Sequence, residues 1–144
     1  MRIIHVFVLL LLGVAACAAT PIKGLLERID KGASRKFIIE QTNAPTDFFE
    51  LDQKDDKVVV RGNNYVCIAT GLNWYLKYYA GIHLSWNSMQ AELPEVLPAV
   101  KQKERHETTM KYRYNFNYCT FSYTMAFWDW ERWEKEIDWM ALHG

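Results

Sequence analysis

Residues 111–144 read KYRYNFNYCTFSYTMAFWDWERWEKEIDWMALHG, and two periodicities follow one another in this stretch. Over residues 111–119 ring-bearing side chains alternate with polar or small ones, and a period of two predicts a β-strand. The ring-bearing residues are Tyr112, Tyr114, Phe116 and Tyr118. From Asp129 onward the apolar residues recur at helical spacing instead. The stretch therefore predicts a strand, a loop and a helix.

The predicted helix starts at Asp129, a favourable N-cap residue, and stops at Gly144, where a glycine commonly ends a helix. Its apolar stripe consists of Trp130, Trp133, Ile137, Met140 and Ala141. Oppositely charged pairs four residues apart, Glu131 with Lys135 and Arg132 with Glu136, indicate that the other surface is solvated. We expect the stripe to cover the aromatic side of the strand.

The second face of the predicted strand is polar or small, which is unusual for an open parallel sheet with helices on both faces. It suits a (β/α) barrel better, because inward-facing side chains near the carboxyl ends of barrel strands line the active site. Asn117 and Cys119 occupy that position, on the non-aromatic face near the end of the strand.

Upstream, three short runs rich in β-branched and aromatic residues, FIIEQT, FFELDQ and VVVRG, predict strands within residues 37–62. Asp55 and Asp56 separate the last two runs and predict a tight hairpin. A helix follows, capped by Asn63 or Asn64 and ended by Gly81, and HLSW at residues 83–86 predicts a returning strand. We interpret residues 30–108 as a small α/β domain and residues 109–144 as the start of a second one.

Residues 1–19 differ in composition from the rest, with a positive start, an apolar run and small residues at the end. The run is too short to cross a bilayer core about 30 Å thick, so it predicts a signal peptide. VAAC at residues 14–17 resembles a lipobox, with Cys17 as the lipid anchor, and ACA at residues 16–18 equally suits an ordinary cleavage site. Both readings predict export: to the periplasm, the cell surface or the medium, or to the lysosome in a eukaryote.

Seventeen basic and 17 acidic residues cancel without long runs of either sign, which argues against a nucleic-acid surface. Cys67 and Cys119 have no neighbouring cysteine, and the histidines are scattered. We therefore expect no metal site and no cofactor, and we do not expect a disulfide between these two cysteines.

The sequence NYCTFSYTMAFWDWERWEKEIDWMALHG at residues 117–144 resembles the start of the catalytic domain of the α-N-acetylglucosaminidases, glycoside hydrolase family 89. VVVRGNNYVCIATGLNWYLKYYAGIHLSW at residues 58–86 is similar to the family's small N-terminal α/β domain. Two departures are Ala126-Phe127 in a tryptophan-richer family pattern and His143 in place of asparagine. The resemblance implies hydrolysis of terminal α-linked N-acetylglucosamine from a glycan, with retention and without metal. It also implies a chain truncated after the first βα unit of the barrel.

The resemblance places Asn117, Cys119 and Tyr123 in the pocket for the terminal sugar, whereas the family's two catalytic glutamates lie on later strands. The residues themselves leave a second reading open, in which Asn117 satisfies nearby backbone and Cys119 packs as a small hydrophobe. The acidic residues from Asp129 to Asp138 are expected on the solvated outer face of the helix, so none is assigned a catalytic role.

A different class of function is a complete, secreted and non-catalytic module that binds glycan or protein through its tyrosine-rich faces. Such a module would be a soluble, cooperatively folding monomer. A fragment with an uncovered apolar stripe would aggregate or oligomerise.

Overall fold

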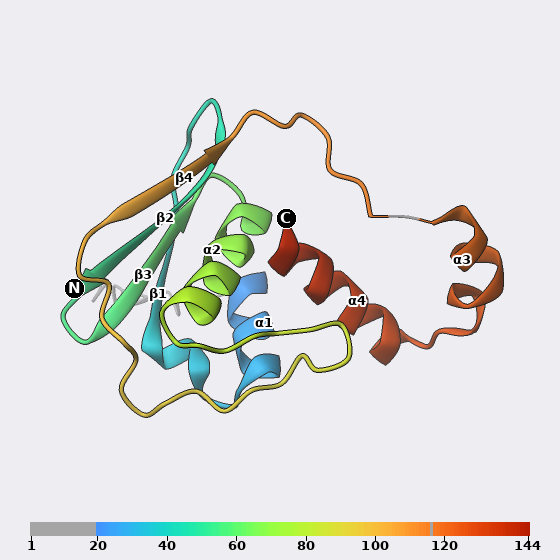
Figure 1. Ribbon diagram of the computed structural model, residues 1–144, viewed down its shortest axis with the longest axis horizontal. Coiled ribbons are helices and arrows are strands. Elements are labelled where there is room, and N and C mark those ends of the chain that lie inside the picture. Colours follow the sequence, from blue (N-terminus) through green and yellow to red (C-terminus); the bar gives the residue numbers. More distant parts are fainter. Residues whose placement is uncertain (1–19, 116) are drawn as a thin grey trace, which may run out of the picture.

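The computed structural model describes residues 20–115 and 117–144; the predicted signal peptide, including Cys17, and Phe116 lie outside them. A four-stranded sheet, in the order β1-β3-β2-β4, has the helices α1 and α2 on one face, and α4 packs against α2 (Figure 1). The helices are α1 Pro21–Ile29, α2 Tyr65–Tyr78, α3 Tyr118–Tyr123 and α4 Trp130–His143, with short 3-10 turns at Ala33–Lys36 and Met125–Phe127. The strands are β1 Phe37–Gln41, β2 Asp47–Lys54, β3 Lys57–Gly62 and β4 Glu104–Thr108.

Strands β2 and β3 form the hairpin that the sequence predicts. Asp55 lies in its turn with φ 55°, in the left-handed region that aspartate tolerates better than most residues. Strand β1 pairs in parallel with β3, so the three predicted strands are confirmed. Strand β4 was not predicted, because its sequence ERHET lacks an apolar alternation. It joins the edge of the sheet by antiparallel pairing with β2.

Helix α2 is also confirmed. The side chain of Asn64 caps its first turn by accepting a hydrogen bond from the backbone N–H of Cys67 at 2.9 Å. The helix lies very close to the sheet at Gly71, where a Cβ atom would stand 3.0 Å from Phe49 and 3.0 Å from Val60. Glycine at this position therefore allows α2 to pack this close to the sheet.

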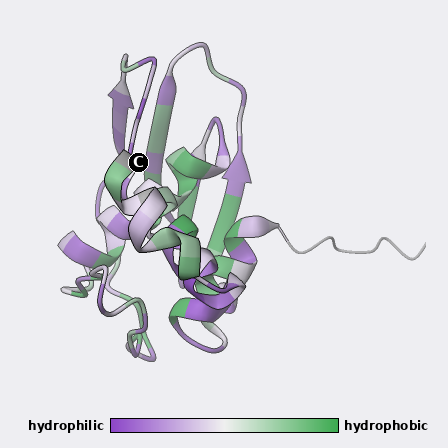
Figure 2. Ribbon diagram, turned by 90° about the vertical axis from the view of Figure 1, so that its right-hand side faces the viewer, coloured by the Kyte–Doolittle hydropathy of each residue, from purple (hydrophilic) through white to green (hydrophobic). Residues whose placement is uncertain are grey.

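Helix α1 was not predicted, although Thr20 and Pro21 are typical of a helix start. Its apolar face belongs to the same core as the sheet and α2, even though the helix precedes residue 30. The buried residues are Ile22, Leu25, Leu26 and Ile29. In Figure 2 the green, hydrophobic segments of the helices and strands meet in the middle of the molecule.

The connector from α2 to β4 is held down by Tyr75, whose hydroxyl donates to the carbonyl oxygen of Pro98 at 2.6 Å. The returning strand expected at residues 83–86 is wrong, since only a single bridge joins Ser85 and Ser88. Among the described residues, no helix is both long and apolar enough to cross a membrane.

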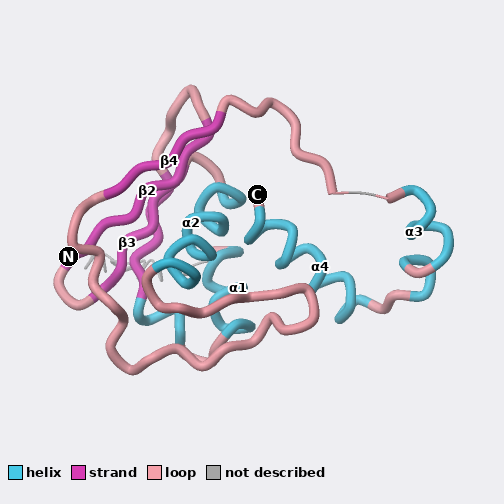
Figure 3. The backbone as a smooth tube through the Cα atoms, in the orientation of Figure 1, coloured by secondary structure: helices cyan, strands magenta, loops and turns pink. Residues whose placement is uncertain are grey.

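The strand expected over residues 111–119 is also wrong. In Figure 3 the chain leaves β4 as a loop, and Tyr118 begins the short helix α3 instead. A strand needs a neighbour for its backbone hydrogen bonds, and none of the described strands pairs with this segment. The carboxamide of Asn117 caps α3 and so favours the helical turn.

Helix α4 has the predicted bounds, with Asp129 as N-cap and Gly144 as C-cap. The expected orientation of its faces is wrong. Two stripe residues are largely exposed, Trp130 at 69% and Ile137 at 46%. The buried residues are Glu136, Asp138 and Leu142, so part of the face expected to be solvated is instead turned toward the rest of the protein.

Candidate functional site

The three expected sugar contacts lie together on α3 and its cap. The side-chain oxygen of Asn117 accepts hydrogen bonds from the backbone N–H groups of Cys119, at 2.9 Å, and of Thr120, at 3.4 Å. This is the backbone-satisfying role that the sequence left open for Asn117. Cys119 is exposed, as is Tyr123 at 75%.

None of the three residues lines either of the two clefts described next. The shared strand face for Asn117 and Cys119 is also absent, because Cys119 is helical. The tyrosines of the expected aromatic face are exposed, Tyr112 at 81% and Tyr114 at 82%. The assignment of Asn117, Cys119 and Tyr123 as sugar contacts stays a prediction from the resemblance.

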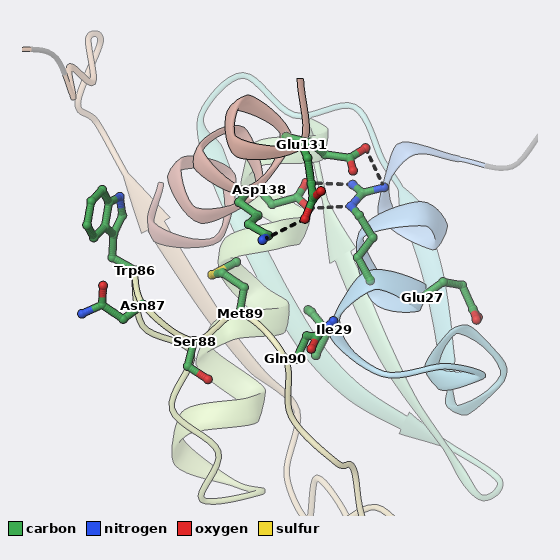
Figure 4. A pocket seen from close by; sticks show the side chains of 12 residues that line it. Glu27, Ile29, Trp86, Asn87, Ser88, Met89, Gln90, Glu131 and Asp138 are labelled. Atoms are coloured by element: carbon green, nitrogen blue, oxygen red, sulfur yellow. Dashed lines mark hydrogen bonds and ion pairs between the residues drawn. The ribbon is translucent and has the colours of Figure 1, made fainter. Parts of the chain in front are cut away.

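The larger cleft has a volume of about 440 Å³ and lies between α1, residues 86–90 and α4 (Figure 4). Arg28 of α1 reaches across it to Asp138 of α4. Its Nε donates to one carboxylate oxygen at 2.6 Å and its Nη2 to the other at 2.8 Å. Glu134 stands 3.5 Å from the third nitrogen. The hydrogen bond to Asp138 raises the pKa of Arg28.

A second polar contact flanks α4 at Trp86. The indole nitrogen of Trp86 donates to Glu136 at 2.6 Å, and Arg132 donates to the same oxygen at 2.9 Å. The guanidinium of Arg132 lies 4.5 Å from the ring centroid of Trp86 and 4.1 Å from that of Trp128. Sequence reasoning placed Trp86 on a strand and missed this cluster, for which the sequence offers no local signal.

The acidic side chains of α4 in and beside the larger cleft are already engaged in ion pairs. Asp138 and Glu136 are held by arginines, and Glu131 pairs with Lys135 at 3.1 Å. The carboxylates of α4 are paired with cations, but Glu136 and Asp138 are buried, which corrects the solvated face that the sequence analysis expected for them. Within residues 20–115 and 117–144 no cluster of histidine, cysteine or acidic residues is arranged to hold a metal ion.

The smaller cleft, about 140 Å³, lies where the segment after β4 meets the start of β2. Asp47 accepts hydrogen bonds from Asn63 at 2.8 Å and Asn64 at 3.0 Å, and pairs with Arg113. The hydrogen bond from Asn63, together with Arg113, lowers the pKa of Asp47. Burial raises the pKa of the Cys67 thiol in this cleft, so Cys67 is not an activated nucleophile.

Comparison with known families matches both parts of the chain. The model of the alpha-N-acetylglucosaminidase (NAGLU) N-terminal domain matches residues 20–99, and that of the alpha-N-acetylglucosaminidase (NAGLU) tim-barrel domain matches residues 113–144. Human alpha-N-acetylglucosaminidase is 49% identical over 88 residues, which are 61% of this chain and 12% of the human protein.

Solved structures agree. A family 89 glycoside hydrolase from Clostridium perfringens, in complex with PUGNAc, superposes with a TM-score of 0.76 at 38% identity. The match covers 84% of this chain and 14% of that one. The Clostridium perfringens enzyme in complex with its substrate GlcNAc-alpha-1,4-galactose gives a TM-score of 0.74 at 38% identity, with the same coverage of both chains.

The chain thus spans about one seventh of the solved structures that it matches. Within that span it carries the small mixed sheet with its helices and the start of the barrel domain. By sequence in both parts, and by fold over most of its length, this chain belongs to the alpha-N-acetylglucosaminidase family, glycoside hydrolase family 89.

Proposed function

We propose that the protein to which this sequence belongs hydrolyses terminal, non-reducing α-linked N-acetylglucosamine from glycans, with retention of configuration. The observation that carries the proposal is the match of two consecutive family domains, over residues 20–99 and 113–144. Further support comes from the 0.74 TM-score with a Clostridium perfringens enzyme that holds GlcNAc-alpha-1,4-galactose. This chain contributes the N-terminal domain and the start of the barrel domain.

In this proposal Asn117, Cys119 and Tyr123 contact the terminal sugar. The amide of Asn117 supplies a donor and an acceptor for hydroxyl groups, Tyr123 a hydroxyl and a ring, and Cys119 a small wall. In the structure the side-chain oxygen of Asn117 caps α3, and its NH2 group is the donor of this amide.

The 144-residue chain alone should be inactive. A retaining glycosidase needs two carboxyl groups about 5–5.5 Å apart at the reacting carbon. The carboxylates of α4 are instead committed to Arg28, Arg132 and Lys135. Release of p-nitrophenol from p-nitrophenyl α-N-acetylglucosaminide by the purified chain would contradict this assignment.

The proposal is tested by a chimera in which residues 20–144 replace the matching segment of the Clostridium perfringens enzyme. We expect the chimera to hydrolyse GlcNAc-alpha-1,4-galactose. Substituting Asn117→Ala should raise KM, whereas Ser122→Ala, an exposed neighbour on α3, should leave it unchanged. A folded chimera without activity would refute the proposed function, and equal kinetics for the two variants would refute the role of Asn117.

We also propose that the protein is exported, on the composition of residues 1–19. Mass spectrometry of the mature N-terminus distinguishes the two routes that the sequence allows. A diacylated Cys17 in the membrane fraction indicates a lipoprotein, and an unmodified N-terminus in the soluble fraction indicates ordinary cleavage. Retention of Met1 on the mature protein would refute export by either route.

A further inference from the structure

Helix α4 docks on the N-terminal domain through charged groups as well as apolar ones. Asp138 is only 13% exposed at its side chain, and it receives two hydrogen bonds from Arg28. A guanidinium and a carboxylate joined by two parallel bonds fix orientation as well as distance. The Arg28–Asp138 pair therefore specifies how α4 is rotated and how far it slides against α1, which an apolar contact alone specifies poorly.

The contact at Trp86 holds α4 from a second direction. Glu136 is 6% exposed at its side chain and bonds to both Trp86 and Arg132. Arg28 comes from α1 and Trp86 from the loop after α2, and both line the larger cleft. A helix that is fixed at two such points has little freedom to rotate about its axis.

The segment before α4 is attached to the same domain at both of its ends. Upstream, Arg113 pairs with Asp47 of β2. Asn63 and Asn64 donate hydrogen bonds to the same carboxylate. Downstream, Trp128 stacks on Arg132, which stacks in turn on Trp86. Residues 114–127, which include all three proposed sugar contacts, are thus bounded by two anchors on the N-terminal domain.

We propose that the N-terminal domain is a positioning element of the enzyme: its Arg28 and Trp86 clamp α4, and with the Asp47–Arg113 pair they set where the sugar-contacting segment stands. Arg28, Trp86 and Asp138 are then positioning residues that touch no substrate. The proposal rests on the proposed function for its effect on substrate, while the clamp itself can be measured without catalysis.

Hydrogen exchange of the α4 amides in the 144-residue chain tests the clamp. Asp138→Asn keeps the shape but removes the charge, and we expect exchange at least tenfold faster, the scale for charged hydrogen bonds that are partly buried. Arg28→Lys keeps the charge but loses the two parallel bonds, so exchange should also accelerate. The double variant Arg28→Asp with Asp138→Arg should restore part of the protection that Arg28→Asp alone loses.

Lys135→Ala is the matched control, because Lys135 lies on the same helix and its ion pair is with the exposed Glu131 of that helix. We expect it to change exchange by less than about twofold, as for exposed pairs. Equal exchange in Asp138→Asn and Lys135→Ala would overturn the clamp. The exchange result stands whether or not any glycosidase activity is found.

The positioning role has its own readout in the active chimera. Asp138→Asn should raise KM about tenfold with a smaller change in kcat, and the charge-exchanged double variant should recover part of the loss. Lys135→Ala should leave both constants unchanged. Faster exchange of α4 in Asp138→Asn without any change in KM would overturn the positioning role, whereas inactivity of the unsubstituted chimera would refute the proposed function instead.

Discussion

Two alanine substitutions in helix α4 test directly which of its faces is packed against the rest of the protein. The periodicity of the sequence favours the stripe that contains Ile137, whereas the structure buries Leu142 completely and leaves Ile137 46% exposed. Leu142→Ala and Ile137→Ala remove the same number of carbon atoms from one helix. Their effects on the free energy of unfolding therefore compare the two faces with little difference in chemistry.

Truncation of a fully buried leucine to alanine costs about 2–5 kcal/mol, and the cost is lowest where the site can collapse. Leu142 lies in the last turn of α4, which can settle toward α2, so we expect about 2–3 kcal/mol. Ile137 loses only about half of the burial of a core residue and gains helix propensity, so Ile137→Ala should cost less than about 1 kcal/mol.

Urea denaturation, followed by tryptophan fluorescence and by far-ultraviolet circular dichroism, measures both values. Unchanged m values would show that the variants expose the same surface on unfolding, as the comparison requires. A cost for Ile137→Ala equal to or above that of Leu142→Ala would refute the observed docking face. No cost for either would refute docking of α4 as part of the cooperative unit.

Further predictions concern Tyr75 and Asp52. Tyr75→Phe leaves the Pro98 carbonyl without its donor and should lower the unfolding free energy by about 1–2 kcal/mol in urea; an unchanged value would contradict the hydrogen bond. Burial raises the pKa of Tyr75, so its contribution is fully present below about pH 10 and is lost as the pH rises further. Tyr75→Phe should therefore flatten the alkaline fall in denaturation midpoint, and an unaltered fall would count against the burial. The hydrogen bond from Arg61 lowers the pKa of Asp52, so its contribution is present above about pH 4 and is lost as the pH falls below that. Asp52→Asn should flatten the acid limb, and a steeper acid limb would contradict the pair.

The hairpin and helix α2 could be predicted because their signals are local. Asp55 supplies the turn conformation between two β-rich runs, and Asn64 supplies a cap directly before an apolar helical pattern. Each of these residues fixes the backbone within a few positions of itself. Such elements are predictable without knowing what packs against them.

The structure of residues 111–119, by contrast, could not be predicted from local signals. Alternation indicates which side chains would share a face if the segment were extended, but backbone pairing has to come from another strand. None of the described strands pairs with this segment, and the cap by Asn117 favours the helical turn instead. The family resemblance, not the periodicity, therefore carries the assignment of Asn117, Cys119 and Tyr123.

The docking of α4 could not be predicted for another reason. Arg28 and Asp138 are 110 residues apart, and neither has a sequence signal that names the other. The charged residues of α4 suggested a solvated face, because local pairs four residues apart are usually exposed. Here one of those acids, Glu136, is shared between its local partner and Trp86, and Asp138 is held from another domain.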